Sequence, residues 1–596
     1  MKWKERLWRN KWQLLVLILV MAVQCCFITQ KQGYHMDELL TFELGNAEYN
    51  PWIVPTQPVG RLAKFMQQEI YEDSLGGTLQ NLLDTVTDVL QNRGSSKLLS
   101  YQADVYEEPV WITREQFQDY ITVGERDGFN YLSVYFNVKD DNHPPLYFML
   151  VHMMSSIFRG RISPWMGCIF NLAAVMGCCI LMFAMGRLLA GHGLLEHRTG
   201  ELWGLCSGLL YGCSSGAIAT TLFIRMYGVM TFLCVLTLYL HLRRWLKEGK
   251  SDKLLILTTV LGFWTQYFFL FYCLLLALVT ILVLLRSGRR KEMLCYIRSM
   301  LIAAVIGVGV YPFAVKHILS SGRGVEAIGN LLSGLTGYGE RLIRFGEIVL
   351  QRTFGGQSWG LLLAVLLVVG AGITTLWRRV KVKQTAQPAV CKEEQDGLTG
   401  NGRNGRWALL AMMIVPPLGY FLLAAKMSPY MVDRYIMPVF PFVSMALAGL
   451  VVYIAQHRKM AAVMIVCLLS AVNIGTYDGE YLYKGYERQL EVAEKYRELP
   501  CICIYEGYGF YDNLLEFATY EQTLLIKPSE LAGRQTKDLE ALDQAVVLIK
   551  QSADPKEALA LLERYGLELE EVLTRESVHG DILILFSHSD GQADES

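Results

Sequence analysis

The sequence has 596 residues, of which 52% are hydrophobic, 11% aromatic and only 19% charged. This composition is too apolar for an ordinary soluble protein of that length. The formal net charge is −1, so nothing in the composition indicates a nucleic-acid-binding protein. The 14 cysteines lie mostly inside apolar runs and form no CxxC pair, which argues against a disulfide framework or a structural zinc site.

Apolar runs that can cross a bilayer recur through the first 475 residues. A helix needs about 20 residues to cross the hydrocarbon region. About eleven such runs are present, at roughly 12–29, 165–187, 201–222, 227–243, 254–266, 267–286, 297–316, 358–377, 407–425, 436–455 and 460–475. The first run lacks a small-x-small cleavage site, so we interpret it as an anchor and not as a signal peptide.

The basic residues predict which side of the membrane each connection faces. Lys2, Lys4, Arg6, Arg9 and Lys11 precede the first run, so the N-terminus is expected in the cytoplasm. Four later basic connections, at 243–247, 286–291, 378–383 and 458–459, are expected there too. All of them face the cytoplasm only if the apolar segment 144–158 does not cross the membrane. We therefore predict a juxtamembrane helix there, after the prolines of "HPPLYF".

This topology divides the chain into two predicted domains. Residues 1–475 would form a transmembrane catalytic domain, with residues 30–164 as a long first extracytoplasmic loop and 381–406 as a polar cytoplasmic linker. Residues 476–596 are soluble in composition. The strand-like segments "CICIYE", "TLLI", "AVVLIK" and "DILILF", with a helix over "PKEALALLERYG", predict a small extracytoplasmic α/β domain without a Gly-rich phosphate loop.

Polar residues gather at the ends of the runs that this topology places outside. They are His35, Asp37 and Glu38, then Asp140, Asp141 and His143, then Arg225 and Tyr227, then Gln266 and Tyr267, and finally Asp433, Arg434 and Tyr435. Each group has a plain structural interpretation: a helix start for the acidic pair, a turn for His143, interfacial anchors for Tyr and Arg, or a local ion pair for Asp433 and Arg434. Ionisable groups that converge on one membrane face nevertheless indicate a functional site.

The segments that carry these residues resemble a known superfamily. "HMDE" after the first run, "DNHPPLYF" before a short apolar helix, "RMY", "TQY" and "RYIMP" together are similar to the GT-C integral-membrane glycosyltransferases. The nearest branch is glycosyltransferase family 39, with the protein O-mannosyltransferases and the lipid A aminoarabinose transferases. The resemblance covers about residues 1–475. One departure is Gln266, where many relatives have His.

The resemblance implies a polytopic α-helical fold of the GT-C type and a transferase of the cell membrane. An enzyme acting outside the cytoplasm has no supply of nucleotide sugars, so its donor would be a hexose or pentose on a polyprenyl phosphate. The acceptor hydroxyl would belong to a glycan, a lipid or a protein. Asp37 is the expected base of an inverting displacement, and Glu38 would orient Asp37 or the acceptor. The alternative class is a polytopic transporter or lipid flippase, for which no internal repeat is visible.

The donor phosphate would be held by cationic and hydrogen-bonding groups. The guanidinium groups of Arg225 and Arg434 match phosphate geometry. Tyr227 and Tyr435 follow these arginines in the sequence, and His143 could donate to the phosphate as well. Lys316, His317 and Arg323 are weaker candidates for the same role. No cofactor is certain. A divalent metal ion is possible, with His35, Asp37, Asp140 and His143 as its candidate ligands.

Overall fold

The computed structural model describes residues 10–72, 74–246, 252–385, 403–455, 458–534, 537–574 and 582–588. The chain divides into two compact units. The first is built from Met1–Thr29, Asp141–Tyr147 and Gly167–Glu480, and the second from Gln30–Asp140, Phe148–Met166 and Tyr481–Ser596. The sequence places a boundary near residue 475, whereas here the first loop and the C-terminal segment share one unit.

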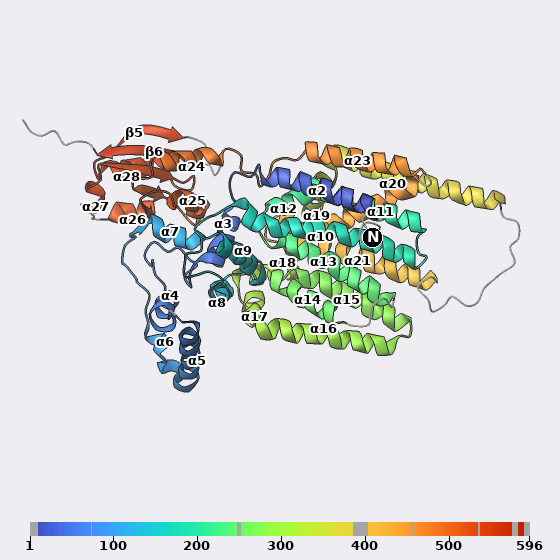
Figure 1. Cartoon of the computed structure of the whole chain (residues 1–596). Helices are drawn as coiled ribbons and strands as arrows, with labels where there is room; N and C mark the ends of the chain where they lie inside the picture. Colours follow the sequence, from blue (N-terminus) through green and yellow to red (C-terminus); the bar gives the residue numbers. More distant parts are fainter. Residues whose placement is uncertain are drawn as a thin grey trace, which may run out of the picture. The chain divides into compact units, whose positions relative to one another are not determined.

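The first unit is a bundle of helices with short connections (Figure 1). Its elements are α2 (Lys11–Ile28), α10 (Pro164–Gly191), α11 (His197–Gly212), α12 (Ser215–Leu222), α13 (Tyr227–Trp245), α14 (Lys253–Thr265), α15 (Phe269–Arg286), α16 (Arg290–Val310), α17 (Phe313–Leu319), α18 (Gly322–Leu332), α19 (Tyr338–Phe354), α20 (Gln357–Thr385), α21 (Arg403–Met427), η4 (Asp433–Val439), α22 (Phe440–Ala455) and α23 (Lys459–Gly475).

All eleven expected spans are helical, and eight of them meet a strict criterion of length and hydropathy. Seven helices among the described residues are long and apolar enough to cross a membrane, and the pair α11 and α12, bent by 56°, makes an eighth. The other three are α13, which ends in Arg243 and Arg244, and the shorter helices α14 and α23, with 13 and 17 residues. The protein is therefore a multi-pass membrane protein.

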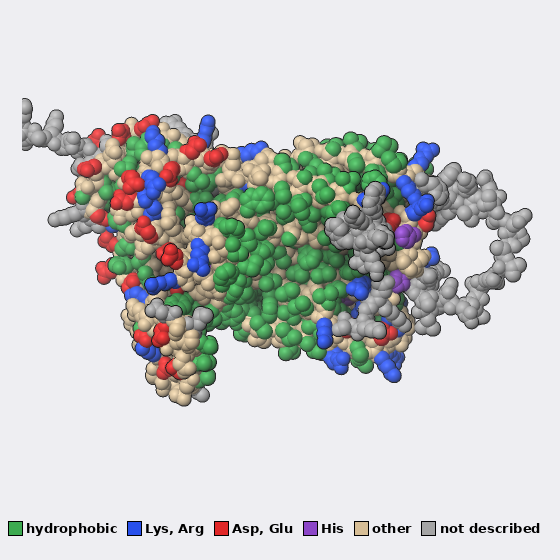
Figure 2. All heavy atoms as spheres, in the orientation of Figure 1, with side chains coloured by type: hydrophobic (Ala, Val, Ile, Leu, Met, Phe, Trp, Pro, Cys, Tyr) green, Lys and Arg blue, Asp and Glu red, His purple; other side chains and the backbone are tan. Residues whose placement is uncertain are grey.

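The surface of this unit fits a bilayer environment. On the face drawn in Figure 2, hydrophobic side chains cover most of the bundle. Basic and histidine side chains gather at the end where α10 passes into α11 and α15 into α16. This is the end at which the sequence predicts cytoplasmic connections. The centre of the predicted linker 381–406, residues 386–402, lies outside the described residues, and its flanks belong to α20 and α21.

Small residues bring α10 and α11 into close backbone contact. A Cβ on Gly186 would lie 2.2 Å from the carbonyl oxygen of Gly200, and one on Gly204 would lie 2.9 Å from that of Met182. Helices in lipid associate through close packing of this kind, because lipid tails are as apolar as the side chains they would replace. These glycines therefore position the long α10, which begins beside the juxtamembrane segment.

The second unit contains the remaining elements. Its helices are α3 (Met36–Asn46), α4 (Arg61–Phe65), η1 (Met66–Ile70), α5 (Leu75–Asn92), η2 (Arg93–Ser95), α6 (Lys97–Ser100), α7 (Arg114–Ile121), α8 (Tyr131–Asn137), η3 (Val138–Asp140), most of α9 (Leu146–Ile157), α24 (Tyr486–Lys495), η5 (Gly509–Asn513), α25 (Leu514–Phe517), α26 (Pro528–Gly533), α27 (Lys537–Glu540) and α28 (Pro555–Glu563). Thr113 and Gln116 form a capping box at the start of α7.

A six-stranded mixed sheet forms the core of the second unit, in the order β1-β3-β2-β4-β6-β5. The strands are β1 (Trp111–Thr113), β2 (Cys501–Ile504), β3 (Gln522–Ile526), β4 (Gln544–Ile549), β5 (Leu567–Thr574) and β6 (Ile582–His588). The central β2 runs parallel to β3 and β4, and the outer pairings are antiparallel. The α/β fold predicted for the C-terminal segment is thus confirmed, and β1 from the first loop extends it.

A helix, α9, is present where the sequence predicts a juxtamembrane one. It contains 12 residues, which at about 1.5 Å per residue is little more than half of the hydrocarbon thickness. We therefore expect cysteines introduced on either side of α9 to face the same side of the membrane. The exposed positions Glu125 and Arg161 suit this test, and opposite labelling by an impermeant thiol reagent would show that α9 crosses.

Candidate functional site

The acidic motif after the first span starts helix α3. His35 has extended backbone angles and is the N-cap, and its Nδ1 accepts a hydrogen bond from the Asp37 N–H at 3.0 Å. Glu38 Oε2 accepts one from the His35 N–H at 2.7 Å. The two bonds form a capping box with His in the place usually taken by Ser or Thr. The plain interpretation of the motif, a helix start, is therefore part of the structure.

Glu38 is buried and held by a lysine. Its Oε2 lies 3.0 Å from Lys31 Nζ, and both side chains are fully inaccessible to solvent. Lys31 also donates to the carbonyl oxygen of Tyr481 at 2.7 Å and lies over the rings of Tyr34 and Tyr483. A carboxylate buried with these partners fixes the first turn of α3.

Asp37 differs from Glu38 in being accessible. Its side chain is 22% exposed, and its Oδ2 lies 3.7 Å from His35 Nδ1. Asp512 of η5 also faces this turn. Burial raises the pKa of Asp512, the charges of Lys550 and His35 lower it, Asp37 raises it, and a hydrogen bond from the Met36 N–H lowers it, for a net increase. Asp37 is thus a carboxylate that a substrate can reach, mounted on a well-fixed turn.

In the helical unit, His143 is held between an acid and an arginine. Asp141 Oδ2 lies 2.8 Å from His143 Nδ1, and Arg225 Nη2 lies 3.4 Å from the same nitrogen. Burial acts to raise the pKa of Asp141, but His143 and Arg225 outweigh it and leave that pKa lowered. Asp141 also contributes to the raised pKa of Tyr267, after the larger effect of burial. Asp141 is therefore an ionised partner of the proposed phosphate ligands.

The second predicted group, Tyr227 with Arg434 and Tyr435, is brought together by aromatic contacts. The rings of Tyr227 and Tyr435 pack edge to face with centroids 6.2 Å apart, and Tyr227 stacks on Phe223 at 6.1 Å. The Arg434 guanidinium carbon lies 5.8 Å from the Phe223 ring and 5.7 Å from that of Tyr435. The backbone N–H of Arg225 donates to the Phe223 carbonyl oxygen at 2.7 Å, which fixes the turn between the two residues. Arg434 therefore lies over the aromatic cluster, while the Arg225 guanidinium lies beside His143.

The weaker candidates have other partners. His317 is buried and its Nδ1 lies 2.9 Å from the Tyr267 hydroxyl. Arg323 is 47% exposed and pairs with Glu326 at 2.9 Å. Gln266 is buried where α14 ends. Asp140, one of the candidate metal ligands, pairs with the neighbouring Lys139. Across the described parts of the chain, no group of three or more His, Cys, Asp or Glu side chains is arranged to hold a metal ion.

A buried arginine network next to this region was not anticipated from the sequence. Arg352 in α19 donates from Nε to Asp433 Oδ2 at 3.0 Å and from Nη1 to both Asp478 oxygens at 3.1 Å, and it also pairs with Glu480. Burial and the nearby Asp433 raise the pKa of Glu480 to about 7. Asp433 directly precedes Arg434, so the network fixes the start of η4. The carboxylate residues lie 81 to 128 positions from Arg352 in the sequence, and no local sequence pattern links residues so far apart.

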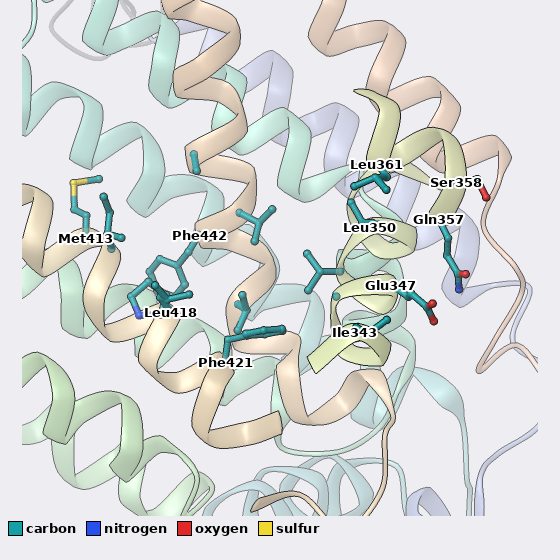
Figure 3. Close-up of a pocket in the computed structure, with 17 residues that line it drawn as sticks. Ile343, Glu347, Leu350, Gln357, Ser358, Leu361, Met413, Leu418, Phe421 and Phe442 are labelled. Carbon is teal, nitrogen blue, oxygen red and sulfur yellow. The ribbon is translucent and has the colours of Figure 1, made fainter. Parts of the chain in front are cut away.

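An apolar cavity of about 780 Å³ lies between α19, α20, α21 and α22 (Figure 3). Figure 3 shows Leu418, Phe421 and Phe442 within it, with Glu347 and Gln357 on one side. Val439, at the end of η4, is another lining residue. The cavity therefore adjoins the element whose first residues are Asp433, Arg434 and Tyr435.

Comparison with known proteins adds a structural relationship. No family model matches the chain, and no curated protein is significantly similar to it in sequence. ArnT from Cupriavidus metallidurans bound to undecaprenyl phosphate aligns over 98% of this chain and 100% of its own, with a TM-score of 0.51 and 10% identity. The chain has an ArnT-like fold. The apo structure of that ArnT aligns over 78% of this chain and 94% of its own, with 10% identity and a TM-score of 0.42.

Proposed function

We propose that the protein is a membrane glycosyltransferase that moves a sugar from a polyprenyl-phosphate donor to an acceptor hydroxyl on the extracytoplasmic face, with inversion. The observation that carries the proposal is the cluster of Tyr227, Arg434 and Tyr435 in a chain with an ArnT-like fold. Arg225, two residues before Tyr227, lies beside His143. The ArnT in the matching structure holds undecaprenyl phosphate, a lipid of the proposed class.

The donor has an anionic headgroup and a long apolar tail. Arg225 and Arg434 would bind the phosphate, since a guanidinium donates two parallel hydrogen bonds to phosphate oxygens. His143, kept close by the ionised Asp141, would donate another. The apolar cavity beside η4 is suited to the polyprenyl chain, because most of its lining is hydrocarbon. No step of this scheme requires a metal ion.

The transfer step needs a base and a stabilised leaving group. The acceptor oxygen would attack the anomeric carbon from the face opposite the phosphate, which inverts the configuration. Asp37 would take the hydroxyl proton, and the bond from the anomeric carbon to the phosphate oxygen would break. The polyprenyl phosphate that leaves carries a new negative charge, which Arg225 and Arg434 would stabilise.

Donor binding should depend on the two arginines. We expect Arg434→Gln and Arg225→Gln each to raise the KM for a polyprenyl-phosphate sugar about 10- to 100-fold, since a hydrogen bond to a charged group contributes about 1.5–3 kcal/mol. Sugar transfer by the purified protein would be followed by mass spectrometry of the lipid and of the acceptor.

Arg187→Gln is the matched control, because Arg187 is an exposed arginine of the same unit that lies 3.9 Å from Glu201 and has no proposed role at the phosphate. Its KM should stay near that of the wild type. If the protein binds the donor, or moves it across a vesicle membrane, without any sugar transfer, the transporter alternative would be favoured. Unchanged KM in both arginine variants would contradict the phosphate assignment.

A further inference from the structure

The segment just before α3 is hydrogen-bonded to residues of the C-terminal segment. Lys31, already paired with Glu38, donates to the Tyr481 carbonyl oxygen at 2.7 Å, and the Gln32 N–H donates to that of Leu482 at 2.8 Å. The segment before α3 and the segment that leads into the α/β fold are therefore joined along their backbones.

The contact between these two segments is close, and the backbone at 481–483 is strained. A Cβ on Gly33 would lie 2.8 Å from the Tyr486 side chain and 2.9 Å from that of Tyr483. Tyr481 and Tyr483 have φ values of 68° and 50°, in the left-handed region that residues with side chains rarely adopt. Such strain persists only where the surroundings fix the backbone, and it is concentrated at functional sites.

At the start of α3, three consecutive backbone N–H groups each have a hydrogen-bond acceptor. Helix starts leave backbone N–H groups without partners inside the helix. Here the His35 N–H is bound by Glu38 and the Asp37 N–H by His35. The N–H between them, of Met36, bonds the Asp512 carboxylate, and η5, which carries Asp512, packs against α3. Asp512 is the member of this set that comes from the distant C-terminal fold.

Asp512 is itself well anchored. It lies in η5, next to Asn513, whose Oδ1 accepts a hydrogen bond from Lys550 Nζ at 2.6 Å. Asn513 also donates to Glu516 Oε1 at 2.8 Å, and Lys550 is only 4% exposed where β4 ends. The backbone of η5 next to Asp512 is thus held by the residue that follows β4.

We propose that Asp512 is a positioning residue for Asp37, so that the C-terminal α/β fold supports the proposed base. The proposal rests on the proposed function, in which Asp37 is the base. Asp512 would hold the Met36 N–H in place. This would fix the first turn of α3, and with it the direction from which Asp37 meets the acceptor hydroxyl. A misplacement of about 1 Å in a reacting group can lower a rate by about 100-fold.

The test compares Asp512→Ala and Asp512→Asn in the full-length protein. Asp512→Ala should lower kcat about 10- to 100-fold and leave the donor KM unchanged, because the phosphate ligands lie in the other unit. Asp512→Asn keeps an oxygen that accepts the Met36 N–H, so it should restore most of kcat. Rescue by Asn identifies holding of the backbone, and not the negative charge, as the role.

Asp554→Ala is the matched control. Asp554 Oδ1 accepts the Lys556 N–H at the start of α28 in the same α/β fold, so this variant loses an equivalent helix cap away from α3. Its kcat should match that of the wild type. Wild-type kcat in Asp512→Ala, no rescue by Asn, or an equal loss in Asp554→Ala would overturn the inference. Absence of transfer by the wild type itself would instead count against the proposed function.

Discussion

Asp37→Asn is expected to lower the rate of sugar transfer by about 10²- to 10⁴-fold, the usual effect of removing a general base. The substitution keeps the size of the side chain and removes its ability to accept a proton. Donor KM should change little, because the proposed phosphate ligands are Arg225 and Arg434. Single-turnover transfer with purified protein and a polyprenyl-phosphate sugar measures the effect directly.

The same variant separates catalysis from helix capping. If Asp37 only favoured the start of α3, its loss would cost at most about 1 kcal/mol of stability and turnover would be normal. The structure already assigns the capping bonds to His35 and Glu38, so we expect the thermal unfolding of Asp37→Asn to resemble that of the wild type. Full turnover in this variant would remove Asp37 from the mechanism, and loss of donor binding would move it to a donor-positioning role.

Arg352→Met is expected to have the largest effect on stability. It would leave the carboxylates of Asp433, Asp478 and Glu480 close together without their shared cation, and Asp433 is only 3% exposed. Removing one partner of a buried ion pair typically costs about 3–5 kcal/mol. Thermal unfolding in detergent should therefore show a clear decrease in Tm. Donor affinity should also fall, because Asp433 fixes the start of η4.

Arg344→Met in the same helix provides the comparison. Arg344 and Glu347 form an exposed pair at 3.1 Å, which we expect to contribute less than about 1 kcal/mol.

The stability that the Arg352 network provides should also depend on pH. The raised pKa of Glu480 means that the folded state holds a proton that the unfolded state has released, so stability should fall as pH rises from about 4.5 to about 7.

Glu480→Gln should weaken that pH dependence, since the group no longer titrates. An Arg352→Met protein with the Tm of the Arg344→Met protein would show that the network contributes little. A Glu480→Gln protein with the same pH dependence as the wild type would place the titration elsewhere.

The features that the sequence predicts correctly are those with a local pattern. The apolar runs became helices, and the short runs of β-branched and aliphatic residues at 501–504, 522–526 and 544–549 became strands, because each pattern is set by residues close in the chain. The motif of His35 and Glu38 was equally visible, since a capping box spans only four residues. Asp37 and Arg434 were selected for their place at the ends of spans, and their roles stay predictions.

The features that were missed depend on contacts between distant segments. The burial of Glu38 follows from Lys31 and from the carbonyl of Tyr481, and nothing near Glu38 in the sequence indicates it. The partners of Arg352 are likewise distributed over α19, η4 and the segment after α23. Strand β1 has only three residues, too few for a periodic signal, and it is a strand because β3 offers it an edge.

The position of β1 determines the order in which the second unit can fold. Arg114, the residue after β1, donates to the Thr519 carbonyl oxygen, 405 residues later in the chain. A ribosome therefore completes every membrane helix before β3 exists, and the first loop must wait outside the sheet until then. A fragment that began at residue 481 would expose the edge of β3 that β1 normally covers. Because uncovered edge strands promote aggregation, a soluble fragment of this sheet needs residues 111–121 as well.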